Sequence, residues 1–272
     1  MKKIFFILIL VLATLPSTAT ATNSVNLKVP FTSEIPDGIW VSPWSNACEE
    51  AAITMVENYY AGEENLTIKQ AKQAMSRLFG IENKIYGFNA DTNAALTARL
   101  INDYSNFTAK IKINPTLEEI KDELRAKRPV ISFHYGKNLP NPEHRWRAGG
   151  SYYHVMTING FDDTKKEFVV NDSASHDNGL DYRYTYATIM DTLADFNHKT
   201  KKTYDQPTVI FTSSKLLVKS TAGKSVYLIN HDIKNRVTSP ELFKVHGWKW
   251  SNVKVISQVK MDSYKTGQPI SK

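Results

Sequence analysis

The stretch V-P-F-T-S-E-I-P-D-G-I-W-V-S-P-W-S-N-A-C-E-E-A-A, residues 29–52, contains the only cysteine of the chain, Cys48. Asn46 stands three residues before Glu49, which is the spacing of a helix N-cap, and apolar side chains follow at helical intervals. We therefore expect a helix capped by Asn46, with Cys48 in its first turn. Free N–H groups and the helix dipole favour an anion there, and a cysteine attacks carbonyl groups as its thiolate.

Two segments downstream supply a histidine and a carboxylate to match this cysteine. They read Y-Y-H-V-M-T-I-N-G-F over residues 152–161 and F-V-V-N-D-S over residues 168–173. Both are rich in β-forming residues and a turn separates them, so His154 and Asp172 are expected side by side on neighbouring strands. The imidazole would take the thiol proton and the carboxylate would orient the ring. Strand alternation lets only one of Asn171 and Asp172 face the site, and we favour Asp172.

Helix signals dominate the first half of the chain and strand signals dominate the second. Besides the helix of Cys48, three helices are expected to start at threonines, namely Thr67, Thr92 and Thr116. The later segments predict strands at 130–133, 153–158, 167–170 and 206–212, and a helix at 186–196. Helices first and strands later predict an α+β fold with an antiparallel sheet in its C-terminal half. A long polar loop, 136–150, leads into His154 and is expected to be functional.

The chain divides into three predicted parts. Residues 1–21 are expected to be a secretory signal peptide, because a basic start, an apolar run and a small-residue cleavage site follow one another. Residues 22–212 are expected to form the α+β domain, and residues 213–272 a small β-rich module. No later stretch is apolar enough for a transmembrane helix. We therefore expect a secreted or extracytoplasmic protein of the cell envelope, without a transmembrane segment after signal removal.

Positive charge is concentrated in the C-terminal module. The whole chain has a net charge of +7, while residues 215–272 hold eleven Lys or Arg and three Asp or Glu, a net charge of +8. Such a basic module would favour an anionic cell-envelope surface, although an ordinary solvated surface is an equally simple interpretation. Nucleic acid is not expected as a partner, because no basic-aromatic binding motif is present.

Other catalytic chemistries lack their sequence signals. No H-E-x-x-H or paired-cysteine spacing predicts a metal site, and no G-x-S-x-G predicts a serine nucleophile. We therefore expect neither a metal nor a cofactor. Three further histidines, His134, His144 and His176, are expected either to line the cleft or to lie on the surface.

The weakest part of the predicted site is the oxyanion hole. Attack by a thiol leaves a negative charge on the carbonyl oxygen, which needs the Cys48 backbone N–H and one further donor. Upstream of the nucleophile, Asn46 is a candidate, but it cannot cap the helix and fill the hole at once. Glu34 stands in a suitable place, yet an ionised carboxylate has no proton to donate.

At these residues the chain resembles the papain-like cysteine peptidases of the bacterial C39-like family, an exported branch related to the double-glycine, or bacteriocin-leader, peptidases. The matching text covers about residues 27–200. Its segments are Val29-Pro30-Phe31-Thr32-Ser33, Trp40, Cys48-Glu49-Glu50-Ala51, Pro129-Val130-Ile131, Tyr153-His154-Val155-Met156, Gly160-Phe161-Asp162, Asn171-Asp172-Ser173, His176 and Tyr182-Arg183-Tyr184.

The resemblance implies a papain-like fold and a Cys48–His154–Asp172 triad that attacks peptide bonds. One departure bears on activity: where the family usually has Gln, this chain has Glu34. If that position donates to the oxyanion, its loss would lower activity by ~10²-fold or more.

Three functions follow as hypotheses. The first is an exported cysteine peptidase that acts on a peptide or protein substrate through a thioester. The second is a catalytically weakened peptide- or wall-binding protein on the same fold. The third keeps the thiol chemistry but directs it to cell-wall peptides, as an amidase or transpeptidase. The intact cysteine, histidine and aspartate favour catalysis over binding.

Overall fold

Four helices come early in the chain, as the sequence predicts. The computed structural model describes residues 23–144, 146, 150–175, 178–230, 232–246 and 248–271, so the predicted signal peptide and His176 lie outside the described residues. The helices are α1 (Cys48–Ala61), α2 (Ile68–Ile85), α3 (Ala94–Tyr104) and α4 (Leu117–Arg125).

Local capping rules explain where three of these helices begin. Thr67 and Thr116 each form a complete capping box, as predicted. The predicted start of α3 at Thr92 is wrong by one residue, because the side chain of Asn93 accepts from the N–H of Leu96 and caps the helix. The Thr92 hydroxyl is buried instead against Thr97 and Glu49.

The second half of the chain supplies most of a seven-stranded sheet in which all neighbours are antiparallel. Its order is β2-β9-β3-β4-β5-β6, with β1 paired to β4. The strands are β1 (Ser24–Asn26), β2 (Phe107–Ile113), β3 (Val130–His134), β4 (His154–Asp162), β5 (Glu167–Asn171), β6 (Tyr182–Thr185) and β9 (Thr208–Ser214). This arrangement confirms the predicted α+β fold.

The late helix is shorter than predicted. α5 (Tyr186–Thr192) ends four residues before the expected position, and the following residues form the strand β7 (Asp195–Asn197), which pairs with β8 (Lys202–Tyr204). Backbone pairing explains the difference, since the N–H of Ala194 donates to the carbonyl of Phe133 at the end of β3. A helix continuing to 196 would give up these ladder bonds.

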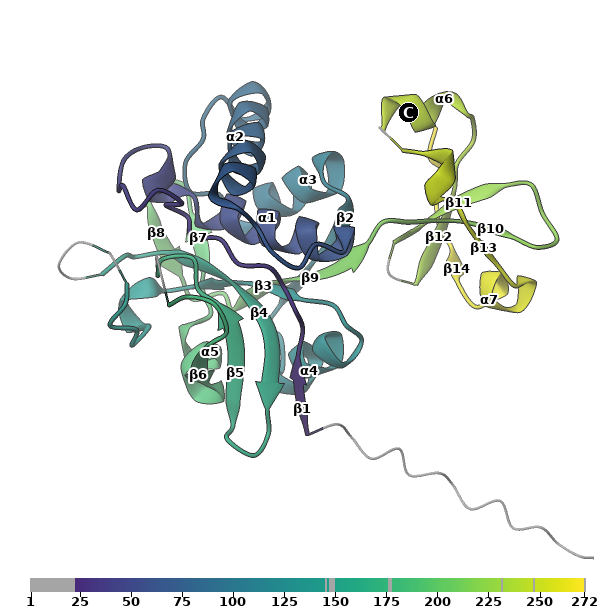
Figure 1. Cartoon of the computed structure of the whole chain (residues 1–272). Coiled ribbons are helices and arrows are strands. Elements are labelled where there is room, and N and C mark those ends of the chain that lie inside the picture. The colour runs from purple at the N-terminus through teal and green to yellow at the C-terminus, as the bar shows by residue number, and fades with distance from the viewer. Residues whose placement is uncertain are drawn as a thin grey trace, which may run out of the picture.

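Helices cover both faces of the sheet. Figure 1 shows α1, α2 and α3 on one side and α4 and α5 on the other. Strand alternation sends Ile131 and Phe133 into the core under α1 to α3, whereas Val130 packs in the core with α4 and α5. Residues 48–56 of α1 are all buried, so the N-terminus of α1 lies inside the molecule.

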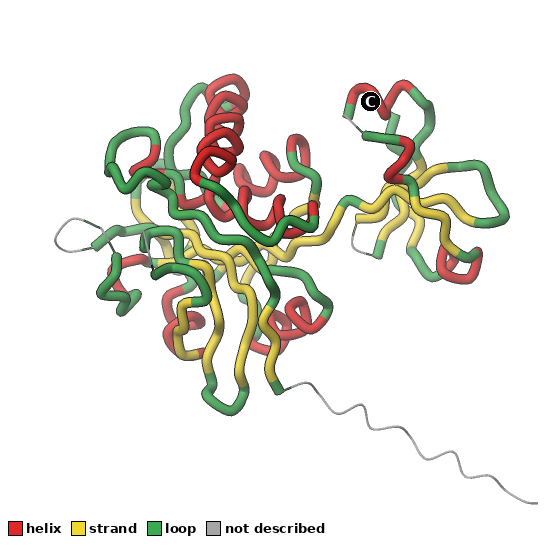
Figure 2. The backbone as a smooth tube through the Cα atoms, viewed as in Figure 1, coloured by secondary structure: helices red, strands yellow, loops and turns green. Residues whose placement is uncertain are grey.

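The C-terminal residues form a second, five-stranded sheet with the order β13-β10-β11-β12-β14. Its elements are β10 (Leu216–Ser220), β11 (Val226–Asn230), β12 (Ile233–Arg236), α6 (Glu241–Val245), β13 (Lys254–Ile256), α7 (Gln258–Asp262) and β14 (Lys265–Thr266). It has its own apolar cluster, which includes Leu217 and Phe243. Figure 2 shows strand β9 leading from the large sheet into this part of the chain.

Only Lys215 separates β9 from β10. Strand β9 continues to Ser214, two residues past the predicted boundary at 212, because it pairs with β2 along its whole length. The division into domains at this point stays a prediction. Among the residues that the structure describes, no helix has the length and apolar character to cross a membrane.

Candidate active site

Cys48 is the first residue of α1, but Asn46 does not cap this helix, so that prediction is wrong. The N-cap is Ala47, which makes no side-chain cap bond. Asn46 closes a short 3-10 helix, Trp44–Asn46, and its N–H donates to the carbonyl of Pro43. This extra turn moves the start of α1 by one residue. It also leaves the Asn46 side chain free to line the cavity beside Cys48.

His154 and Asp172 lie in contact. His154 begins β4 and Asp172 directly follows β5, and the Nε2 atom of His154 lies 2.9 Å from Oδ1 of Asp172. The other ring nitrogen, Nδ1, is therefore left for Cys48. The Cys48 Sγ, a ring nitrogen of His154 and a carboxyl oxygen of Glu34 all lie within 4.8 Å of one another. Of the six residues predicted for the site, the structure thus brings Glu34, Cys48, His154 and Asp172 together, and a fifth, Asn46, lines the same cavity.

Asn171 faces away from this group. Its side-chain amide donates to the carbonyl of Val29 at 3.0 Å and accepts from the N–H of Asp181 at 3.2 Å. The alternation of β5 therefore turns Asp172, not Asn171, toward His154. Asn171 instead ties the N-terminal segment to the sheet.

The carboxylate of Asp172 is surrounded by hydrogen-bond donors. Besides His154, four groups donate to it: the amide of Asn141 at 2.9 Å, the ring of His144 at 2.7 Å, the hydroxyl of Tyr184 at 2.7 Å and the N–H of Ala174 at 3.3 Å. Burial alone would raise the pKa of Asp172, but the bonds from His144 and His154 outweigh it and hold this pKa well below its usual range. Asp172 is therefore ionised, and it fixes the proton of His154 on Nε2.

Two side chains that donate to Asp172, those of Asn141 and Tyr184, are not predicted as site residues from the sequence. Asn141 belongs to the polar loop at 136–150 and Tyr184 to β6, so neither is close to Asp172 in sequence. The polar loop was expected to be functional, and Tyr184 stands in a Tyr-Arg-Tyr segment whose alternation places Tyr182 and Tyr184 on one face of β6. Those were the available signals.

Of the other histidines considered for the cleft, His134 lies in the core and His144 joins the site. His134 is fully buried behind the site, where Thr192 and Ser132 contact its two ring nitrogens at 2.9 and 2.8 Å. Burial, with a contribution from His154, lowers the pKa of His134 to about 3. His134 is thus a neutral core residue and not part of the cleft, whereas His144 joins the site through Asp172. Trp146 packs edge-on against the ring of His154, with 5.2 Å between the centroids.

Electrostatics at Cys48 differ from the expectation of a stabilised thiolate. The thiol donates to Oε2 of Glu49 at 3.1 Å. Burial, followed by the charges of Glu49, Glu34 and Asp91, raises the pKa of Cys48 well above its ordinary value. Burial also lowers the pKa of His154, and the bond to Asp172 offsets only part of this shift. The resting pair is therefore a neutral thiol beside a neutral imidazole.

Acidic side chains gather around the N-terminus of α1. Glu49 and Glu50 are each 1% exposed, and Glu82 of α2 is completely buried. Oε1 of Glu49 accepts from the backbone N–H of Thr92 at 2.5 Å. Burial raises the pKa of Glu82 to about 7 and the pKa of Asp91 to about 6. No pattern in the sequence predicts that these acids are buried.

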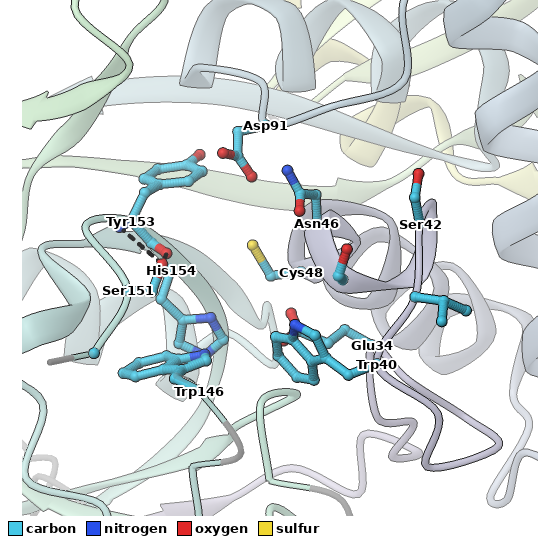
Figure 3. Close-up of a pocket in the computed structure, with 13 residues that line it drawn as sticks. Glu34, Trp40, Ser42, Asn46, Cys48, Asp91, Trp146, Ser151, Tyr153 and His154 are labelled. Carbon is cyan, nitrogen blue, oxygen red and sulfur yellow. Dashed lines mark hydrogen bonds between the residues drawn. The ribbon is translucent and has the colours of Figure 1, made fainter. Parts of the chain in front are cut away.

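A cavity of about 450 Å³ lies next to Cys48 and His154. Figure 3 shows Cys48 near its centre, with His154 and Trp146 on one side and Glu34 and Trp40 on the other. Its lining also includes Val41, Ser42, Ser45, Asn46, Asp91, Gly150, Ser151 and Tyr153. A carbonyl group entering it can therefore reach both the thiol and the imidazole.

Two sets of three potential metal ligands occur among the described residues, and both include His154. One is Glu34, Cys48 and His154, and the other is His144, His154 and Asp172. In the second set both histidines donate through Nε2 to the ionised Asp172, so those nitrogens carry protons and cannot bind a metal. We interpret the first set as the reacting groups of a thiol enzyme and neither as a metal site.

Comparison with known proteins assigns the chain to a family. The model of the Peptidase C39 like family matches residues 26–207, which span the whole cavity and both segments of the sheet that carry His154 and Asp172. Comparison with curated proteins gives no significant match.

Solved structures show low similarity. A Bacillus anthracis protein assigned as a C39-like peptidase is 14% identical with a TM-score of 0.45, over 70% of this chain and 98% of that chain. UfSP from C. elegans is 14% identical with a TM-score of 0.33, over 73% of this chain and 36% of that chain. The endolysin LysIME-EF1 is 11% identical with a TM-score of 0.18, over 70% of this chain and 84% of that chain. The assignment rests on the family model, which covers more than half of the sequence. The chain belongs to the Peptidase C39 like family.

Proposed function

We propose that the protein is an exported cysteine peptidase that hydrolyses peptide bonds through Cys48, His154 and Asp172. The observation that carries this proposal is that a thiol and a neutral imidazole line one open cavity, while a buried, ionised carboxylate is hydrogen-bonded to the imidazole behind it. Family membership supports a peptidase-type reaction. The export step rests on the N-terminal sequence pattern, which is typical of a secretory signal.

The first half of the reaction forms a thioester. Sγ of Cys48 bonds to the carbonyl carbon while Nδ1 of His154 takes the thiol proton, and the π electrons of the carbonyl move onto oxygen. In the resting state the thiol donates to Glu49, so it must turn toward Nδ1 of His154, which is neutral and has its other nitrogen fixed by Asp172. The tetrahedral intermediate then collapses, the C–N bond breaks, and the amine leaves with the proton from His154.

The second half releases the acid product. A water molecule gives a proton to His154 and its oxygen bonds to the thioester carbon. Collapse of this intermediate breaks the C–S bond, and the proton returns from His154 to Sγ of Cys48. The buried Asp172 stays ionised throughout, because its five donors stabilise the charge better than a proton would.

The surroundings of the cavity favour an extended peptide as substrate. Trp40 and Trp146 lie on opposite sides of Cys48, and Val41 at the rim is 51% exposed. These apolar surfaces suit side chains on both sides of a scissile bond. The C-terminal sheet carries the net positive charge of the chain, and we propose that it holds the enzyme near an anionic envelope surface.

The test is turnover of a fluorogenic peptide library by the wild type, Cys48→Ala and His154→Ala. We expect both variants to lose activity by ~10⁴-fold or more while their circular dichroism spectra match that of the wild type. His246→Ala, directly after helix α6 in the C-terminal part of the chain, is the matched control for removal of a histidine and should keep full activity. A wild type that binds peptides but cleaves none, even in purified wall material, would leave only the binding function.

A further inference from the structure

Glu34 lines the cavity next to the two groups that react, Cys48 and His154. Its carboxyl lies within 4.8 Å of both the Cys48 sulfur and a His154 nitrogen, and the residue is only 3% exposed. The backbone holds it in place, because the N–H of Glu34 donates to the carbonyl of Ser173 at 3.0 Å, next to Asp172. Glu34 is therefore a fixed part of the site and not a mobile surface side chain.

An ionised Glu34 would oppose the reaction. Two negative charges about 4 Å apart repel each other by about 4 kcal/mol at the effective dielectric constant of a protein site. A carboxylate beside the oxyanion would therefore slow thiol attack by roughly 10³-fold. A neutral carboxyl group has the reverse effect, because its O–H is a hydrogen-bond donor.

The groups that face Glu34 favour its neutral form. They are Cys48, Glu49 and Glu50 on α1, Asp91 before α3, His154 on β4 and Asp172 after β5. Within the described part of the chain, no lysine or arginine forms an ion pair with Glu34. Burial, followed by the charge of Asp172, raises the pKa of Glu34 well above its ordinary value, and Glu49, Asp91 and Glu50 would add to this shift whenever they ionise.

We propose that Glu34 works as a neutral carboxylic acid whose O–H donates to the carbonyl oxygen of the substrate, so that the enzyme is active in acid and loses activity as Glu34 ionises. This inference rests on the proposed peptidase function. The oxyanion of the first step would accept from the Cys48 backbone N–H and from Glu34 at the same time. The proton stays on Glu34 throughout, so only a hydrogen bond is made and lost.

The directions of the two pKa shifts define the active range. His154 must be neutral to accept the thiol proton, and its lowered pKa keeps it neutral at a pH below its ordinary value near 6.5. Glu34 must be protonated, and its raised pKa keeps it protonated at a pH above its ordinary value near 4.5. Activity therefore rises as His154 loses its proton and falls at higher pH as Glu34 loses its own.

The test compares kcat and KM across pH for the wild type, Glu34→Gln and Glu34→Ala. The amide of Gln donates at every pH, so Glu34→Gln should not lose activity as the pH rises. The ratio of kcat/KM at about pH 8 to kcat/KM at about pH 5 should therefore be ~10-fold or more higher for Glu34→Gln than for the wild type. Glu34→Ala removes the donor and should lower kcat by ~10²-fold in acid with little change in KM, and it should not be slower than the wild type at alkaline pH, where the wild-type carboxylate repels the oxyanion. A wild-type profile that is flat from acid to alkaline pH, or equal activity of Glu34→Ala and wild type in acid, would overturn the proposal.

Asn46 is the competing donor, since its side chain also lines the cavity. If Asn46→Ala costs ~10²-fold in kcat and the Glu34 variants cost nothing, the oxyanion donor is Asn46 and the proposal is wrong. A loss that appears only in the Glu34 variants supports Glu34.

A readout without turnover separates this inference from the proposed function. The infrared difference spectrum of wild type minus Glu34→Gln should contain the carbonyl band of a protonated carboxylic acid at about pH 6, which disappears at higher pH. If that band is present and no variant cleaves any peptide, the peptidase function fails while the neutral Glu34 stands. If the band is absent at acid pH, Glu34 is ionised and this inference fails whatever the activity is.

Discussion

The sheet and the helices that position the site hold buried carboxyl groups in opposite protonation states. On the sheet side, Asp172 is completely buried and ionised, because five donors converge on it. On the helix side, Glu50 and Glu82 are equally buried and share a hydrogen bond between their carboxyl groups, but within the described residues both oxygens of Glu82 and one oxygen of Glu50 have no other hydrogen-bond partner. Burial raises the pKa of both glutamates, and the charge of Glu82 adds to the shift of Glu50. Donors, and not burial, therefore decide which acid carries charge.

The strongest test of this comparison removes the charge of Asp172. Asp172→Asn keeps the shape of the side chain but replaces a carboxylate that accepts on both oxygens with an amide that accepts on one. His154 would lose its preferred tautomer, so kcat should fall by on the order of 10³- to 10⁴-fold. Steady-state kinetics on a cleaved peptide measure the effect. Asp181→Asn, at a more exposed position nearby, is the control and should cost far less.

The helix side predicts an unusual dependence of stability on pH. Glu82 has a raised pKa in the folded protein, so the native state binds this proton more tightly than the unfolded state does. Stability from this group is present below about pH 4.5 and is lost as the pH rises through about 7. Glu82→Gln should therefore raise the free energy of unfolding at about pH 8 by up to about 3 kcal/mol and change it little in acid.

Urea unfolding of the wild type and Glu82→Gln at several pH values measures this difference. Glu64→Gln, on the exposed loop before α2, is the matched control. A gain in stability that is the same at every pH would show that Glu82 is not protonated in the native state.

Gly179 tests whether the backbone holds Asp172 in its donor-rich position. The N–H of Asp172 donates to the carbonyl of Gly179 at 2.8 Å. A Cβ atom at Gly179 would lie 2.0 Å from the carbonyl oxygen of Asp172 and 2.8 Å from the ring of Phe31. Gly179→Ala should therefore displace Asp172 and cost about 1–3 kcal/mol of stability, with a fall in kcat. Gly62→Ala offers open space, although its positive φ adds strain of its own.

The smallest expected effect is the loss of one donor. Tyr184→Phe removes the hydroxyl that donates to Asp172 at 2.7 Å and leaves four donors in place. We expect a cost of about 1 kcal/mol in stability and a decrease of up to ~10-fold in kcat/KM. Tyr182→Phe is the control on the same face of β6. Equal effects of the two variants would mean that the donors around Asp172 do not act individually.

The correct predictions from the sequence rest mostly on local rules for helix capping and strand alternation. Thr67 and Thr116 sit three residues before a Gln and a Glu, so their capping boxes need no tertiary information. Strand alternation predicted that only one of Asn171 and Asp172 faces the site, and the favoured residue, Asp172, is the one that the structure turns toward His154. Asn46 failed as a cap because a preceding 3-10 turn moved the helix start, which no helix pattern records.

The protonation states of the acids in the site could not be predicted from the sequence. Two glutamates directly after Cys48 suggest an exposed helix start, whereas α1 buries both against α2 and the loop that carries Thr92. The donors of Asp172 come from three separate parts of the chain, and only their final packing brings them together. Charge in a buried site depends on such long-range neighbours, which sequence spacing does not give.

The passage from β9 into β10 has a mechanical consequence. Strand β9 lies between β2 and β3 in the catalytic sheet, and one residue, Lys215, joins it to the C-terminal sheet. Nζ of Lys215 donates to the carbonyls of Asn102 and Ser105, both at 2.7 Å, and so fixes the connection between β9 and β10 to the end of α3. If the C-terminal sheet is tethered to a surface, a pulling force loads β9 along its axis. The hydrogen bonds to both neighbours then share the load in shear, so the enzyme can stay folded and active under tension.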